Sequence, residues 1–137
     1  MIIGIGSDIV DIRRIEKSLK QFGAKFETRV FTPLERKKVA SRKKSGAKII
    51  AGAYAKRFAA KEACVKALGI LENGGLSWQD IEITNLPSGA PTITLYGGAL
   101  KKLKSLTPSK TQASIHVSLS DDYPFAQAFV IISAEPK

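Results

Sequence analysis

The sequence predicts an α+β fold in which a mainly antiparallel sheet packs against one long helix. The first observation is an apolar, β-branched segment at positions 2–10, which favours a strand at the N-terminus. The second is a helical pattern from about Lys48 to Leu68, which Gly69 ends. The third is the order of the elements. Helices and strands do not alternate as they do in βαβ units, so a parallel sheet is not favoured.

Several shorter helices are expected between the first strand and the long helix. Each is inferred from a cap, an apolar period or a glycine stop. They are a helix that Asp11 caps and whose apolar residues are Ile12, Ile15, Leu19 and Phe22, a short helix over 24–31, and a basic helix that Thr32 caps, Pro33 begins and Gly46 ends.

The C-terminal half predicts mostly strands. Glycine and proline turns separate short β-branched segments there, which is typical of antiparallel hairpins. The expected elements are strands over 81–85 and 92–96 joined by a turn over 87–91, a helix over 98–106, and strands over 113–120 and 126–133.

Composition indicates one domain that spans residues 1–137. Hydrophobic residues make up 44% of the chain, enough for a core, and no stretch approaches the ~20 apolar residues that cross a bilayer. The N-terminus predicts a strand rather than a charged leader, and the single cysteine, Cys64, is typical of a reducing compartment, so we expect a cytoplasmic protein. The net charge of +10 predicts a polyanionic partner, which is nucleic acid, acidic lipid or an acidic protein.

The long helix carries the residues of most chemical interest. Arg57, Lys61, Glu62 and Lys66 lie within about two and a half helical turns. Cations around one carboxylate suit a polyphosphate and its metal, because the cations meet phosphate oxygens while the carboxylate holds Mg²⁺. The alternative is a solvated surface pair between Glu62 and Lys66. Lys61 falls inside the apolar arc of the helix, where an ammonium must reach outward or find a buried anion.

Two strands add further polar groups. In the first strand, alternation places Gly4, Gly6 and Asp8 on one face, which is bare backbone ending in a carboxylate. A ligand or another backbone can approach such a face closely; the alternative is a helix packed on the glycines, with Asp8 in solvent. In the strand over 113–120, His116 shares a face with two serines. That row can donate hydrogen bonds to phosphate, or it can be the wet face of an ordinary antiparallel strand.

Taken in order, these three segments resemble the holo-[acyl-carrier-protein] synthases, which are small 4′-phosphopantetheinyl transferases. The matching stretches are Gly4-Ile-Gly-Ser-Asp-Ile-Val-Asp with Arg14-Ile15 following, Arg57-Phe-Ala-Ala-Lys-Glu-Ala with Lys66-Ala67 and Gly69 following, and His116-Val-Ser-Leu-Ser. The resemblance runs nearly end to end. Each stretch alone is weak, but three in sequence form a specific signal, and they imply the fold of that family.

The resemblance implies an enzyme that transfers the 4′-phosphopantetheine of coenzyme A to a serine of apo acyl carrier protein. Adenosine 3′,5′-bisphosphate is released, and the product supports fatty acid biosynthesis. The implied catalytic residues are Asp8, Glu62 and Lys66, with Mg²⁺ as the cofactor that Asp8 and Glu62 hold. Glu62, or a water that it orients, would accept the serine proton, while Lys66 would neutralise the leaving phosphate. The expected contacts to the other coenzyme A phosphates are Arg57, Lys61 and His116.

Acyl carrier proteins are acidic, so the basic face of the first helix is expected to dock this partner. The alternative is a solvated amphipathic face. The family forms trimers with sites between subunits, so a homotrimer is also expected. The basic residues of the first helix are Arg13, Arg14, Lys17 and Lys20.

Two positions depart from the family pattern. Ile70 and Leu71 follow Gly69, where the family commonly has Thr-Gly. Asp121 follows the His-Val-Ser-Leu-Ser stretch, where many members have a histidine. An aspartate cannot repeat the donor role of a histidine at neutral pH, so no function is assigned to Asp121.

The composition also suits functions of other classes. For a nucleic-acid-binding module, the +10 charge and the basic run from Arg36 to Lys44 would supply phosphate contacts. Aromatic residues are not interleaved with that run as a stacking platform requires, and no zinc spacing or helix-turn-helix signature occurs, so we expect neither nucleic-acid nor membrane binding. A weaker alternative is a catalytically silent carrier-binding subunit that keeps the fold.

Overall fold

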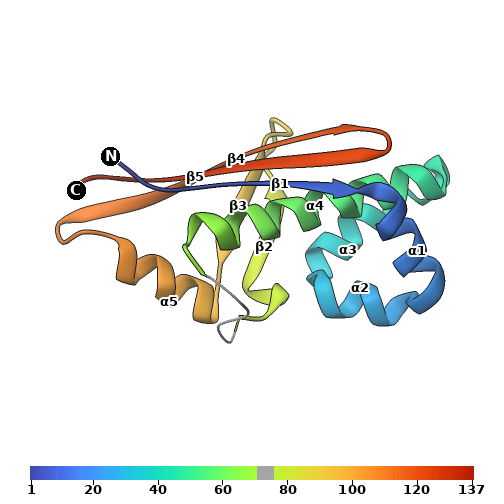
Figure 1. The fold of residues 1–137 in the computed structure, drawn as a ribbon, viewed down its shortest axis with the longest axis horizontal. Coiled ribbons are helices and arrows are strands. Elements are labelled where there is room, and N and C mark those ends of the chain that lie inside the picture. Colours follow the sequence, from blue (N-terminus) through green and yellow to red (C-terminus); the bar gives the residue numbers. More distant parts are fainter. Residues whose placement is uncertain (71–75) are drawn as a thin grey trace.

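A three-stranded antiparallel sheet lies along one side of the molecule, and a long helix packs against its inner face (Figure 1). The computed structural model describes residues 1–70 and 76–137. The strand order is β1-β5-β4, and the elements are β1 (Ile2–Asp11), β5 (Phe125–Pro136), β4 (Thr111–Asp122) and helix α4 (Ala47–Ala67).

The remaining elements lie around α4 (Figure 1). Three short helices gather near its N-terminal end, whereas α5 and a separate two-stranded hairpin follow it in the chain. These are α1 (Ile12–Phe22), α2 (Ala24–Val30), α3 (Pro33–Ala40), the 3₁₀ helices η1 (Lys43–Ser45) and η2 (Trp78–Asp80), hairpin strands β2 (Ile81–Asn85) and β3 (Pro91–Leu95), and α5 (Gly97–Leu106). The element order and the antiparallel pairing confirm the predicted α+β fold. The last two strands are longer than predicted, because they stay paired from Thr111↔Pro136 to Asp122↔Phe125.

The caps predicted from the sequence are formed. The side chain of Asp11 accepts a hydrogen bond from the backbone N–H of Arg13 and so caps α1. Thr32 caps α3 and makes a capping box with Glu35, in which each side chain accepts from the backbone N–H of the other. These caps fix where the chain leaves β1 and where it enters α3.

The glycines of β1 allow the sheet to meet α4 at its backbone. A methyl group on Gly4 would overlap the carbonyl oxygen of Ala67, and one on Gly6 would overlap that of Ala63. The close neighbour of the glycine face is therefore the backbone of α4, as expected if a helix packs on Gly4 and Gly6. Asp8 is the next residue on this face, so the same contact brings its carboxylate to the side of α4.

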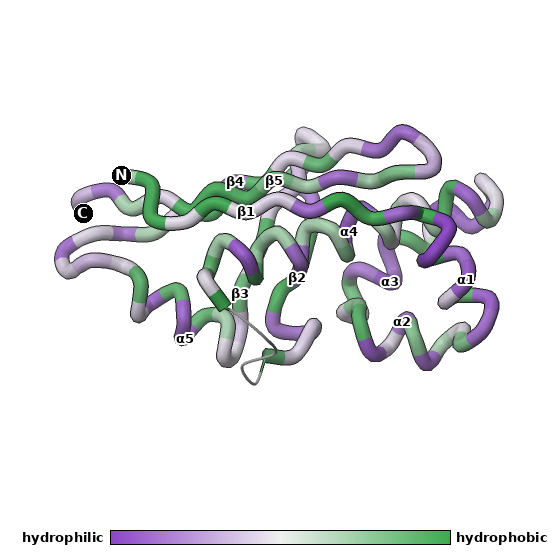
Figure 2. The backbone as a smooth tube through the Cα atoms, viewed as in Figure 1, coloured by the Kyte–Doolittle hydropathy of each residue, from purple (hydrophilic) through white to green (hydrophobic). Residues whose placement is uncertain are grey.

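The core lies between the sheet and α4. The central strand β5 contributes buried side chains to it, and β4 contributes half-buried ones packed against it. In Figure 2, apolar colour runs along the strands, whereas polar colour predominates along α1. The buried residues of β5 are Ala126, Ala128, Val130, Ile132 and Ala134.

The outer face of β1 and β5 also carries apolar side chains, and none of the residues that the structure describes covers them. Ile5 and Ile9 of β1 are each 65% exposed, and Phe125 and Phe129 of β5 are 50% and 48% exposed. A contiguous exposed apolar face is unusual for a monomer and is typical of an interaction surface. Over residues 1–70 and 76–137, none of the helices combines the length and the apolarity that crossing a membrane requires.

Candidate functional site

The strand β1 and the helix α4 bring three of the predicted site residues together. The ammonium nitrogen Nζ of Lys66 lies 3.3 Å from Oδ1 of Asp8 and donates a hydrogen bond of 2.9 Å to the backbone carbonyl of Ser7. Glu62 precedes Lys66 by one helical turn, so both side chains leave α4 on the same side. Asp8 and Lys66 are 58 residues apart in the sequence, so the fold brings distant positions into one site.

The charges of Asp8 and Lys66 both act on the pKa of Glu62. Partial burial raises the pKa of Glu62, and the negative charge of Asp8 raises this pKa further, while Lys66 and Arg14 act in the opposite direction. The effect of Asp8 on Glu62 places the two carboxylates within electrostatic reach of each other. Arg14 of α1, predicted from the sequence as a partner-docking residue, also acts electrostatically on Glu62.

The donor set of this site fits Mg²⁺. This ion usually takes one or two protein carboxylates and completes its shell with water and substrate phosphate. Asp8 and Glu62 supply two such carboxylates, and their like charges are close enough to favour a divalent counter-ion. Among the residues that the structure describes, no group of three or more His, Cys, Asp or Glu side chains could hold a metal by itself. Beyond Asp8 and Glu62, an ion at this site would complete its shell with water or substrate phosphate.

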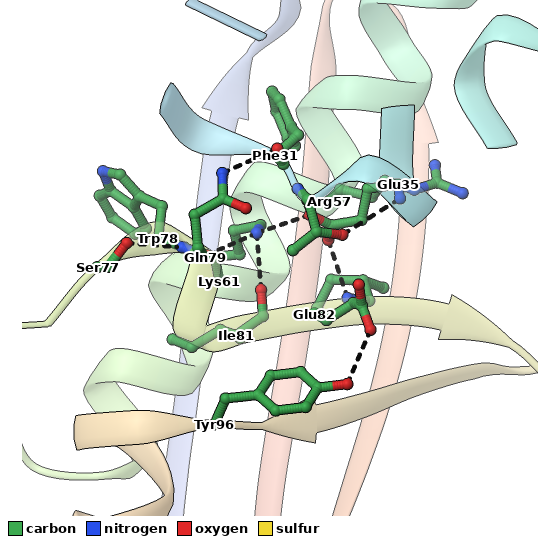
Figure 3. Close-up of polar contacts among 12 residues, drawn as sticks. Phe31, Glu35, Arg57, Lys61, Ser77, Trp78, Gln79, Ile81, Glu82 and Tyr96 are labelled. Carbon is green, nitrogen blue, oxygen red and sulfur yellow. Dashed lines mark hydrogen bonds and ion pairs between the residues drawn. The ribbon is translucent and has the colours of Figure 1, made fainter. Parts of the chain in front are cut away.

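Lys61 is not part of this site, which corrects its sequence-based assignment to coenzyme A phosphate. Its side chain is fully buried, and Nζ lies 2.7 Å from Oε1 of Glu35, 2.8 Å from the carbonyl of Trp78 and 2.7 Å from that of Ile81 (Figure 3). An ammonium has three donors, and these three acceptors use all of them. Of the two alternatives for an ammonium in the apolar arc, outward reach or a buried anion, the structure shows the buried anion, which is Glu35.

Glu35 was not identified as an important residue from the sequence. One of its carboxylate oxygens accepts from the backbone N–H of Thr32 at 2.8 Å, and the other from that of Ile83 at 2.9 Å. Together with Lys61, it ties α3, β2 and α4 into one buried polar network (Figure 3). The available signal was the spacing Thr32-x-x-Glu35, which is that of a capping box.

Arg57 also lies away from the Asp8–Glu62 contact. Its side chain is 7% exposed, and Nη1 donates 3.0 Å to the carbonyl of Ala53 one turn earlier in α4. Burial lowers the pKa of Arg57, an effect that the charge of Glu35 opposes. Its Nε is buried and has no hydrogen-bond partner among the described residues. The assignment of Arg57 to a coenzyme A phosphate stays a prediction.

His116 points to the outer face of the sheet. Its neighbours Ile115 and Val117 pack against the core, whereas His116 is exposed and its Nε2 lies 3.1 Å from Oγ of Ser133 on β5. Because α4 covers the inner face, His116 and Glu62 lie on opposite sides of the sheet within one chain. A single chain therefore does not bring His116 to the Asp8–Glu62 site.

The predicted partner-binding residues line the outward side of α1. Arg13, Arg14, Lys17 and Lys20 are all exposed. Arg13 is held by Asp11, with Nη2 at 2.7 Å from Oδ2 and Nε at 2.9 Å from Oδ1. This basic surface follows directly on the strand that carries Asp8, so it borders the site.

Comparisons with known proteins agree with this geometry. The family model described as the 4′-phosphopantetheinyl transferase superfamily matches residues 4–128. The chain belongs to this superfamily. It is 54% identical over 136 residues to a holo-[acyl-carrier-protein] synthase of Brucella ovis, covering 99% of this chain and 98% of the relative. The resemblance that the sequence motifs implied is therefore confirmed.

Solved structures support the same membership. The crystal structure of Helicobacter pylori holo-[acyl-carrier-protein] synthase in complex with coenzyme A is 39% identical, with a TM-score of 0.74 over 94% of this chain and 99% of that one. The holo-ACP-synthase of Plasmodium yoelii is 34% identical, with a TM-score of 0.80 over 100% of this chain and 98% of that one. The phosphopantetheinyl transferase fold thus extends over the described length of the chain.

The structure bears on one departure from the usual transferase sequence. Asp121, which stands where many members have histidine, pairs with Lys56 of α4 at 3.3 Å between Oδ1 and Nζ. This contact lies beside a cleft of about 320 Å³ between α4, the start of α1 and the β4–β5 turn. Of the other departure, Ile70 follows α4, and Leu71 lies outside the described residues.

Proposed function

We propose that this chain transfers the 4′-phosphopantetheine group of coenzyme A to a serine of apo acyl carrier protein, as a Mg²⁺-dependent holo-[acyl-carrier-protein] synthase. The observation that carries the proposal is the convergence of Asp8, Glu62 and Lys66, two carboxylates and a cation from β1 and α4. Membership of the superfamily and the coenzyme A complex of the Helicobacter pylori relative support the choice of substrate.

Asp8 and Glu62 would hold the metal ion through their carboxylate oxygens. Bound there, Mg²⁺ would supply Lewis-acid neutralisation of the diphosphate charge. The raised pKa of Glu62 suits it to take a proton, either from the attacking serine hydroxyl or through a water that it orients.

The transfer itself exchanges one phosphorus–oxygen bond for another. The serine oxygen attacks the phosphorus that bears the pantetheine, the bond to the second phosphate breaks, and adenosine 3′,5′-bisphosphate leaves with the bonding electron pair. The serine proton passes to Glu62 or its water. Lys66, one turn along α4, neutralises the charge on the leaving phosphate.

The acidic carrier would dock on the basic side of α1. The exposed cations of that helix attract a negatively charged partner and orient it on encounter. Since Arg14 also acts electrostatically on Glu62, a carrier bound there would present its serine near the carboxylates. The docking residues are Arg13, Arg14, Lys17 and Lys20.

We infer that the working form is a homotrimer with sites between subunits. The exposed apolar outer face of the sheet, with Ile5, Ile9 and Phe129, supports contacts between copies. His116 lies on the same face, so a neighbouring copy that covers it would bring His116 to that copy's coenzyme A. This accounts for a predicted phosphate ligand that is remote from Glu62 in its own chain.

Mass spectrometry of apo acyl carrier protein tests the function. Incubation with the protein, coenzyme A and Mg²⁺ should add one phosphopantetheine to the carrier, and a chelator should abolish the gain. Glu62→Ala should lose it, whereas Glu135→Ala, which removes an exposed carboxylate paired with the N-terminus, should keep it. No gain with the unaltered protein, combined with salt-sensitive binding to DNA or RNA, would favour the nucleic-acid module instead.

A further inference from the structure

Lys66 is bound to one of the two carboxylates that would hold the metal ion. Its Nζ lies 3.3 Å from Oδ1 of Asp8, and the carbonyl of Ser7 at 2.9 Å fixes the ammonium at the same end of β1. Lys66 thereby places one positive charge directly on a metal-binding oxygen. A divalent ion on Oδ1 would need the same space and would repel the ammonium at such a distance.

The two ends of this contact differ in their freedom to move. The side chain of Asp8 is 17% exposed and is held on the strand that packs against α4, whereas the side chain of Lys66 is 55% exposed. A lysine has four methylene groups and a rotating ammonium, so an exposed lysine can change partner at small cost. If one member of the pair yields, it is Lys66.

We propose that Lys66 is an exchangeable counter-ion of Asp8, which divalent-cation binding displaces and which then turns to a phosphate of the substrate. The inference rests on the proposed function, because it assumes a metal ion on Asp8 and Glu62. In the free protein the contact weakens metal binding, since the ion must replace an existing cation. A phosphate that draws Lys66 away strengthens metal binding, and by linkage the metal strengthens phosphate binding. Lys66 is thus available for the leaving phosphate when the ion is in place.

Mn²⁺ binding to the protein without coenzyme A tests the proposal, by titration calorimetry or by the electron paramagnetic resonance signal of free Mn²⁺. Lys66→Met removes the charge and keeps the length of the side chain, so it should tighten Mn²⁺ binding on the order of threefold to tenfold. Lys56→Met is the matched control, because Lys56 lies on the same helix but pairs with Asp121, and its Mn²⁺ affinity should equal that of the unaltered protein.

Arg14→Met distinguishes displacement of Lys66 from Asp8 from a general repulsion of the metal ion by nearby positive charge. Arg14 also acts on Glu62 but makes no ion pair with Asp8, so its removal should tighten Mn²⁺ binding by less than about twofold. Equal gains in the Arg14 and Lys66 variants, or an unchanged or weaker affinity in Lys66→Met, would overturn the proposal. Far-UV circular dichroism and the urea midpoint establish that each variant is folded.

Failure of the proposed function gives a different result. If Glu62→Ala binds Mn²⁺ as well as the unaltered protein does, the ion does not use this site, and both the metal assignment and the exchange are rejected. If Glu62→Ala loses binding and Lys66→Met gains none, the metal site stands and the exchange alone is rejected.

Discussion

Replacement of Lys61 by methionine should destabilise the protein strongly, because it removes the centre of a buried polar network. The ammonium makes three short hydrogen bonds, to Glu35 at 2.7 Å and to the carbonyls of Trp78 and Ile81 at 2.8 Å and 2.7 Å. Both side chains of the ion pair are 0% exposed. Without Lys61, the two carbonyls lose this donor, and the Glu35 carboxylate keeps only its backbone N–H donors.

The expected loss is about 3–5 kcal/mol of unfolding free energy, the usual cost of leaving one charge of a buried pair without its partner. That is a large part of the ~5–15 kcal/mol by which domains are stable. With a urea m-value of about 2 kcal/mol/M, the unfolding midpoint should fall by about 1.5–2.5 M. Urea titration followed by far-UV circular dichroism measures it.

Two further variants decide whether the ion pair is the cause. Lys56→Met removes a lysine of the same helix whose partner Asp121 is partly exposed, and it should cost less than about 1 kcal/mol. Adding Glu35→Gln to Lys61→Met removes the stranded charge and should recover part of the loss. The reasoning is refuted if Lys61→Met costs no more than Lys56→Met, or if the second substitution worsens the loss.

Four other outcomes are expected. Gly6→Ala should lower the unfolding free energy by about 2 kcal/mol or more, because its methyl group would overlap the Ala63 carbonyl; an unchanged urea midpoint would refute the close contact. Cys64 should stay unreactive toward a thiol reagent at pH 8 until the protein is unfolded, since burial raises the pKa of its thiol to about 12. Arg14→Glu should lower kcat/KM for the carrier on the order of tenfold and leave coenzyme A affinity nearly intact; equal loss of both would reject the docking surface. Ile9→Asp should dissociate the assembly in sedimentation equilibrium, and an unchanged mass would contradict the proposed contact between copies.

Local signals in the sequence were enough to predict most of the elements, although the helix that Pro33 begins ends at Ala40 rather than at Gly46. The alternation that put Gly4, Gly6 and Asp8 on one face depends only on the period of a strand, and the caps at Asp11 and Thr32 depend on residues within one turn. The long helix was predicted to within a residue at each end. These features need no knowledge of which segments meet in space.

The partners of side chains that pack across the fold could not be predicted in this way. Lys61 and Glu35 are separated by 26 positions, and their contact depends on how α3 and β2 pack against α4. The strand pattern put His116 opposite Ile115 and Val117, but the pattern alone does not say which face α4 covers. The polar row of His116 and the apolar arc around Lys61 left an anion open as partner, and the family resemblance favoured a coenzyme A phosphate. Neither signal says where each side chain points.

The most direct test of the account is the location of a metal ion in crystals grown with coenzyme A and Mn²⁺. Anomalous scattering identifies Mn²⁺ independently of the refined atoms. We expect one strong peak per site, with a carboxylate oxygen from Asp8 and one from Glu62 as ligands and with Lys66 released from Asp8. Coenzyme A bound with no peak at this position, or with a peak whose ligands include neither carboxylate, would contradict the account.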